Sequence, residues 1–173
     1  MIEQISKAFP DGILVPEELK LLCEWTEENG YPISGYFELR AGDGDDFFYW
    51  FNSRDADAEL ALFGAGGDGS MYCIWKQVDG RQPVVHLGSE GDELKVLAKD
   101  MKDFLRLLAI GYADIGHDDM SRPPIQEEEN NPKFQEWIRN SLTLKIPEIG
   151  DEILKPAISS HDDLAAWVAT KSN

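Results

Sequence analysis

The chain has 173 residues and a formal charge of -17, with sixteen lysines and arginines against thirty-three aspartates and glutamates. An electrostatic field of this sign repels phosphate backbones and attracts cationic surfaces, which argues against direct nucleic-acid binding. Hydrophobic residues make up 42% of the chain and include five tryptophans and eight phenylalanines, so an intrinsically disordered chain is excluded. This length suits one compact domain with a single core.

The negative charge is concentrated in the two flanks of the chain. Residues 1–60 hold fourteen acids against four bases, residues 61–115 hold eight against six, and residues 116–173 hold eleven against six. Such a surplus of acid serves solubility in many proteins. The functional alternative is a basic protein partner.

The cysteines and the first residues indicate a reducing compartment. Cys23 and Cys73 stand alone in apolar surroundings, which is typical of thiols that fill a core. The chain does not begin with a basic segment followed by an apolar block, and no stretch reaches the ~20 apolar residues that cross a bilayer. We therefore expect a cytoplasmic protein without a membrane contact.

The first part of the chain predicts a helix, a strand and a tight turn. Pro16 at a first helical position, an apolar stripe and Gly30 after the last turn indicate an amphipathic helix. Residues 36–40 alternate as a weak strand, and residues 42–46 have the glycine and aspartate content of a turn. The aromatic run 47–51 fits a strand or a short buried segment.

The centre of the chain predicts a β-meander. Residues 58–63 fit a short helix or strand, and residues 64–69 are expected to form a loop because four glycines destabilise either element. Residues 71–75 and 84–87 read as strands, and the Asp-Gly pair within residues 78–81 is the kind of turn that joins antiparallel strands.

The last part of the chain predicts three helices. Asp100 followed by Asp103 resembles a capping box, and the apolar face that follows suits a buried helix. Residues 116–132 have the composition of a solvated connection. Two shorter helices are then expected, one with Phe134, Trp137 and Ile138 on one face, and one that begins after Ser160 and turns Leu164, Trp167 and Val168 inward.

The sequence has only weak matches to motifs that bind a nucleotide cofactor or a metal ion. The glycines of residues 64–69 match the letters of a dinucleotide-binding loop, but a strand is expected after them where that motif needs a helix. Asp43, Asp45, Asp46 and Asp68 carry oxygen ligands for a hard cation, yet their spacing lacks the calcium-loop pattern. We therefore expect neither a cofactor nor a metal.

An enzymatic site is not expected either. His86, His117 and His161 lie in three different contexts, without metal-ligand spacing, and no serine lies in a Gly-x-Ser-x-Gly elbow. The alternative is a small hydrolase in which folding brings Cys23 or Cys73 beside a histidine.

The acids around the aromatic run are the candidate partner-binding residues. Loops that display acids beside aromatic side chains suit recognition of a basic surface. These acids are Asp43, Asp45, Asp46, Asp55 and Asp57. The alternative is an ordinary solvated turn.

The order of short motifs from residue 64 to residue 112 resembles the SMI1/KNR4 family of the SUKH superfamily. The chain has Gly67-Asp68-Gly69, then the strands 71–75 and 83–87, then Gly88-Ser89-Glu90-Gly91, then an apolar helix through Leu108. The helix between Pro16 and Gly30 resembles the family's opening helix. Roughly residues 14–112 are covered.

The resemblance implies an α+β domain with a mostly antiparallel sheet packed with helices. It implies one domain over residues 1–173, with a family-like core at 14–112 and an acidic helical extension at 113–173. Bacterial members are commonly immunity proteins that neutralise toxin domains, often nucleases, whereas fungal relatives are regulatory scaffolds. Gly67, Asp68 and Gly69 carry over as loop-shaping positions only, and no catalytic residue carries over. We therefore expect an immunity-type binder of a basic toxin, with a regulatory scaffold as the alternative.

Overall fold

The chain folds as an α+β structure around one antiparallel sheet in a computed structural model that describes residues 1–91, 93–126 and 128–172. The strands lie in the sheet in chain order and pair antiparallel throughout. They are β1 (Glu38–Leu39), β2 (Leu60–Ala65), β3 (Met71–Trp75), β4 (Val84–Leu87) and β5 (Lys95–Ala98). The predicted class, α+β with an antiparallel sheet packed with helices, is confirmed.

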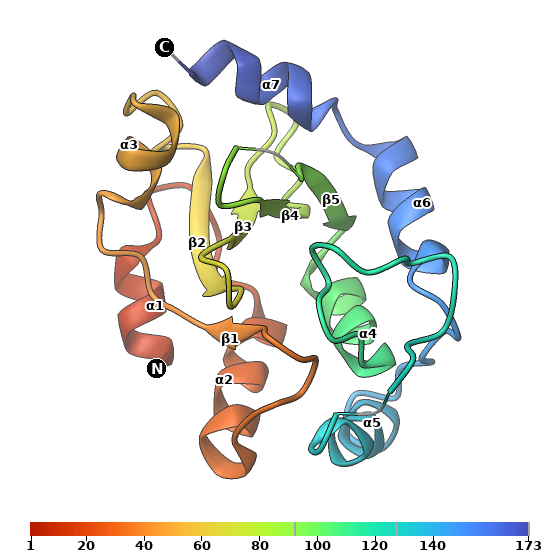
Figure 1. Cartoon of the computed structure of the whole chain (residues 1–173). Helices are drawn as coiled ribbons and strands as arrows, with labels where there is room; N and C mark the ends of the chain where they lie inside the picture. The colour runs from red at the N-terminus through yellow and green to blue at the C-terminus, as the bar shows by residue number, and fades with distance from the viewer. Residues whose placement is uncertain (92, 127, 173) are drawn as a thin grey trace.

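Helices cover both faces of this sheet and flank β5 (Figure 1). Their bounds are α1 (Ile2–Ala8), α2 (Glu17–Asn29), α3 (Asp46–Phe51), α4 (Met101–Ile110), α5 (Asn131–Asn140), α6 (Asp151–Ser160) and α7 (Leu164–Lys171). Within the described ranges, none of these helices is long and apolar enough to cross a membrane.

The strands are buried on both sides because alternate side chains enter two different apolar clusters. In β3, Tyr72 and Ile74 join the cluster formed with α1, α2, α4 and α5. Met71, Cys73 and Trp75 join the opposite cluster, which includes Phe51 from α3 and residues of α7. Helix α6 contributes to both clusters, so side chains from the last third of the chain help to build both sides of the core.

Several local predictions are confirmed. The strands β3 and β4 have the predicted bounds, and they are joined by the predicted Asp-Gly turn, in which Gly80 has a φ of 85°. Helix α4 begins as predicted, because the Asp100 carboxylate accepts a hydrogen bond of 2.8 Å from the N–H of Asp103. Helix α2 begins one residue later than predicted, with Pro16 as its N-cap.

The prediction for the aromatic run was wrong. Residues 46–51 form helix α3, which is neither a strand nor a buried segment. A helix spreads consecutive side chains around its axis, so Phe51 packs into the core while Tyr49 remains 78% exposed. All five aromatic side chains could be buried only if the segment were covered on every side, and α3 is not.

The glycine-rich loop is shorter than predicted, because Gly64 and Ala65 belong to β2. A Cβ atom on Gly64 would lie 2.5 Å from Cε2 of Phe37, so the missing side chain makes room for that ring. A bulge between Leu62 and Gly64 accommodates the irregular pairing.

Two C-terminal predictions need correction, and three elements were missed. Helix α7 is capped by Asp163, whose carboxylate accepts from Ala166, whereas Ser160 ends α6. The segment 116–132 is not wholly solvated, because Met120 is buried. Sequence analysis also missed α1, β5 and α6.

Candidate functional site

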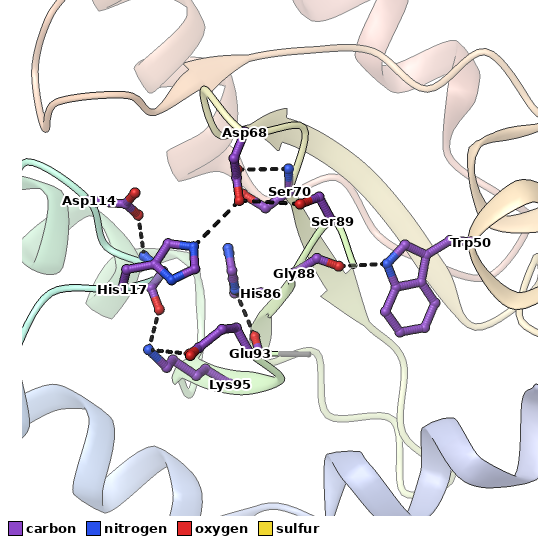
Figure 2. Close-up of polar contacts among 11 residues, drawn as sticks. Trp50, Asp68, Ser70, His86, Gly88, Ser89, Glu93, Lys95, Asp114 and His117 are labelled. Carbon is purple, nitrogen blue, oxygen red and sulfur yellow. Dashed lines mark hydrogen bonds and ion pairs between the residues drawn. The ribbon is translucent and has the colours of Figure 1, made fainter. Parts of the chain in front are cut away.

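The β2–β3 turn places Asp68 at one end of the sheet. The Asp68 carboxylate accepts from the backbone N–H of Ser70 at 3.0 Å, and the Ser89 hydroxyl donates to it at 3.4 Å. Nε2 of His117 lies 3.4 Å from the same carboxylate. Three segments distant in sequence therefore meet around one acid (Figure 2).

Asp68 remains ionised at this position. The Ser70 hydroxyl, the Ser70 N–H and His117 hold the pKa of Asp68 well below its usual range, against the opposing effect of partial burial. Its side chain is 38% exposed, so a full negative charge is presented to solvent at the end of the sheet.

Further acids gather around Asp68 from the β4–β5 connection and from residues 113–118. Gly116 donates its N–H to Asp114, and Asp114 donates its N–H to Asp118. We term Asp68, Glu93, Asp114 and Asp118 the sheet-end acids, together with the exposed Glu90, which directly follows the Asp68-bound Ser89 in the chain. Lys95 contacts this group, but its ammonium already binds Glu93 at 3.0 Å and the Gly116 carbonyl. The region therefore keeps a surplus of negative charge.

His86 lies behind the sheet-end acids and is fully buried. Its Nδ1 lies 2.9 Å from the Glu93 carbonyl, which only accepts, so Nδ1 carries the proton and Nε2 is a bare acceptor. Nε2 is buried and has no partner among the described residues. Gly116 covers this atom, since a Cβ there would lie 2.5 Å from it.

Burial of His86 makes stability depend on pH. Burial lowers the pKa of His86, so below the ordinary histidine pKa the unfolded chain binds a proton that the folded chain does not. The stability due to neutral His86 is present above about pH 6.5 and is lost as the pH falls from there toward the lower folded pKa. Urea unfolding at pH 7.5 and pH 5 should show a smaller loss of stability for His86→Gln than for the wild type.

His161→Gln should be measured in the same way, because burial and then Arg81 lower the pKa of His161 as well. Its effect shows how much of the pH dependence of stability comes from His161. The carboxylates titrate in every variant, so their contribution cancels in the comparison. If His86→Gln lost as much stability between pH 7.5 and pH 5 as the wild type does, the role of His86 in the pH dependence would be contradicted.

The predicted interface acids around α3 are partly neutralised within the chain. Asp46 pairs with Arg40 and is mostly buried. The guanidinium of Arg54 pairs with both Asp45 and Asp57. These arginines lower the net charge of that surface.

The remaining two acids of this group are more open to solvent. Asp43 and Asp55 are exposed, although the Asp43 carboxylate accepts from the N–H of Asp45. Helix α3 also lies next to the β4–β5 connection, because Nε1 of Trp50 donates to the Gly88 carbonyl at 2.8 Å. Helix α3 thus contacts the connection that carries Glu90 and Glu93.

The positions carried over as loop-shaping lie in the β2–β3 turn. Gly69 has a φ of 88°, a left-handed conformation that favours glycine. A Cβ on Gly67 would lie 3.3 Å from Cβ, Cγ and Cδ1 of Tyr36, so that side chain packs against the turn beside Asp68.

The cysteines do not meet the histidines in the described residues. Cys23 and Cys73 are buried, and burial raises the pKa of both thiols. The histidines contact Glu93, Asp68 and Gln77 instead. The same part of the chain contains no group of three or more metal-ligating side chains placed to hold an ion.

A cavity of about 410 Å³ lies away from the sheet-end acids and shares no residue with them. Leu14, Arg81, Lys99 and His161 are among its lining residues. Its opposite charges are balanced, since Glu18 and Asp100 face the two bases. It therefore offers no strong preference for an ion of either sign.

Comparison with protein-family models, curated proteins and solved structures gave no match to this chain in any of the three.

Proposed function

We propose that this chain is a protein-binding module that docks a basic protein on its acidic surface. The observation that carries the proposal is the group of sheet-end acids, in which the contacting base, Lys95, is already engaged. Most other lysines and arginines are paired with carboxylates outside this group, so they do not neutralise the sheet-end acids. Of the predicted interface acids Asp43, Asp45, Asp46, Asp55 and Asp57, the exposed Asp43 and Asp55 form the second part of this surface.

The partner proposed is a toxin domain, with this chain as its immunity protein. The resemblance to the SMI1/KNR4 family supports this assignment. Nuclease toxins carry basic clefts for their substrates, and an acidic protein that covers such a cleft blocks access of nucleic acid. Complementary charge also speeds association, which favours capture of a lethal enzyme before it acts.

A regulatory scaffold without a toxin partner is the second candidate, and the same resemblance supports it. The two differ in gene context, because an immunity gene lies beside the gene for its toxin. A scaffold gene has no such neighbour.

Co-expression with the product of the adjacent gene tests the proposal. We expect that product to inhibit growth when expressed alone, and this chain to restore growth and to co-purify with it. Asp68→Asn combined with Glu90→Gln should weaken the rescue. A toxic neighbour that kills equally well in the presence of this chain would contradict the immunity function.

A further inference from the structure

A buried histidine nitrogen, Nε2 of His86, lies among the sheet-end acids. Nε2 of His86 is fully buried and has no hydrogen-bond partner among the described residues. Figure 2 shows the ring between Glu93 and Asp68, with one nitrogen turned to Glu93 and the other end toward Asp68 and Ser89. Because Nε2 is an acceptor in this tautomer, only a donor group satisfies it. A ligand that binds beside His86 must therefore donate hydrogen bonds, which excludes anions.

An exposed aromatic ring flanks the same place. Tyr36 is 64% exposed, and its ring packs against Gly67, next to Asp68. The Tyr36 N–H donates to the Ala113 carbonyl at 3.1 Å, which sets the ring beside the segment that carries Asp114. One side chain with a flat cationic group can stack on this ring and reach the carboxylates on either side.

We propose that the sheet-end acids form a docking site for an arginine side chain of the partner. The guanidinium stacks on Tyr36 and donates to the Asp68 carboxylate. This inference rests on the proposed function, because it specifies the chemistry of the basic surface that the chain would bind.

The arginine replaces His117 at Asp68. The contact between His117 and Asp68 is 3.4 Å, longer than the ~2.8 Å of a strong charge-assisted hydrogen bond. A guanidinium brings several N–H donors in a rigid fork, which suits a carboxylate better than one imidazole nitrogen does. Nε2 of His86 lies beneath Gly116, the chain neighbour of His117, so this exchange changes the surroundings of that acceptor.

Arginine is favoured over lysine at this site for two reasons. The guanidinium is planar and weakly hydrated, so it stacks on an aromatic face, whereas the ammonium of lysine is a compact and strongly hydrated charge. Carboxylates elsewhere on the surface also prefer arginine, because its fork donates to both carboxylate oxygens. The part of the difference between arginine and lysine that depends on Tyr36 therefore measures the site.

Calorimetric titration of the full chain with hexa-arginine and with hexa-lysine tests the inference. We expect hexa-arginine to bind more tightly, and Tyr36→Leu to weaken hexa-arginine about threefold and hexa-lysine less. Tyr36→Phe, which keeps the ring, should bind as the wild type does. Tyr49→Leu removes an exposed aromatic residue from α3, 78% exposed against 64% for Tyr36, and is the matched control.

Nitrogen-15 NMR of labelled histidine supplies a readout that overall charge would not move. With three histidines in the chain, the signals are few, and hexa-arginine should shift Nε2 of His86 and both nitrogens of His117. Equal binding of the two peptides, with unchanged histidine signals, would overturn the arginine site and leave acidic docking intact. Failure of both peptides to bind would contradict the proposed function as well.

Discussion

Gly35→Ala should lower the free energy of unfolding by about 3 kcal/mol or more, because a side chain at this position has no room. A Cβ there would lie 1.7 Å from the carbonyl oxygen of Ala113, which is backbone and cannot rotate away. The φ of Gly35 is 42°, in the left-handed region. Ser34 and Tyr36 on either side both bond to residues 112–113, so the whole contact must separate. Urea denaturation measures the loss.

Gly44→Ala is the matched control for this prediction. Gly44 also has a positive φ, at 90°, but nothing lies within 4 Å of a Cβ built on it. Its substitution therefore carries only the conformational cost, about 1 kcal/mol. Equal losses in the two variants would mean that residues 35 and 113 do not approach as closely as described. Because Tyr36 follows Gly35, the Gly35 variant should also lose selectivity for hexa-arginine.

Phe104→Ala should cost about 3–5 kcal/mol, the range for an aromatic side chain removed from a packed core. Phe104 is fully buried in α4, and its ring lies 5.4 Å from Phe63 and 5.5 Å from Phe37, centroid to centroid. It also lies 6.0 Å from Tyr72, whose ring packs on His86 at 5.2 Å. The loss thus includes aromatic pairs as well as the buried area.

Thermal and urea unfolding measure this effect, with Ile158→Ala as the control, because Ile158 is 57% exposed on α6. The control should change stability by less than about 0.5 kcal/mol. A loss below 1 kcal/mol for Phe104→Ala would show that the cluster around α4 is loosely packed. We expect a secondary effect on the His86 signals, since the ring chain Phe104–Tyr72–His86 would relax.

The fold was predictable where one signal determines an element. The Asp100 cap, the Asp-Gly turn at residues 79–80 and the amphipathic stripe of α2 each act locally, and each prediction holds. Elements set by tertiary contacts were not predictable. Strand β5 has four residues and no pattern of its own, and Gly64 lies in a strand through its pairing with Leu39 and Tyr72, where the ring of Phe37 occupies the space of a side chain. Helix α6 contains Pro156, a residue that argues against a helix in sequence analysis.

For the candidate site, too, local features were predictable from the sequence and tertiary contacts were not. Acids near α3 were singled out because they are close in sequence to aromatic residues, yet Arg40 and Arg54 neutralise part of them. The acids that the fold gathers at the sheet end come from three separate segments. Their local signal was turn chemistry, as in Asp68-x-Ser70 and Asp114-x-Gly116, where a carboxylate accepts a backbone N–H two residues on. That signal predicts turns and says nothing of which turns meet.

The most direct measurement is the binding of hexa-arginine to two variants that lose the same charge at different places. Asp68→Asn with Glu90→Gln removes two sheet-end acids, and Glu24→Gln with Glu136→Gln removes two exposed acids from α2 and α5. At about 0.1 M salt the Debye length is about 10 Å, so only nearby charges contribute strongly. We expect the first pair to weaken binding about tenfold and the second to change it less than twofold. Equal weakening by both pairs would contradict a localised acidic docking surface.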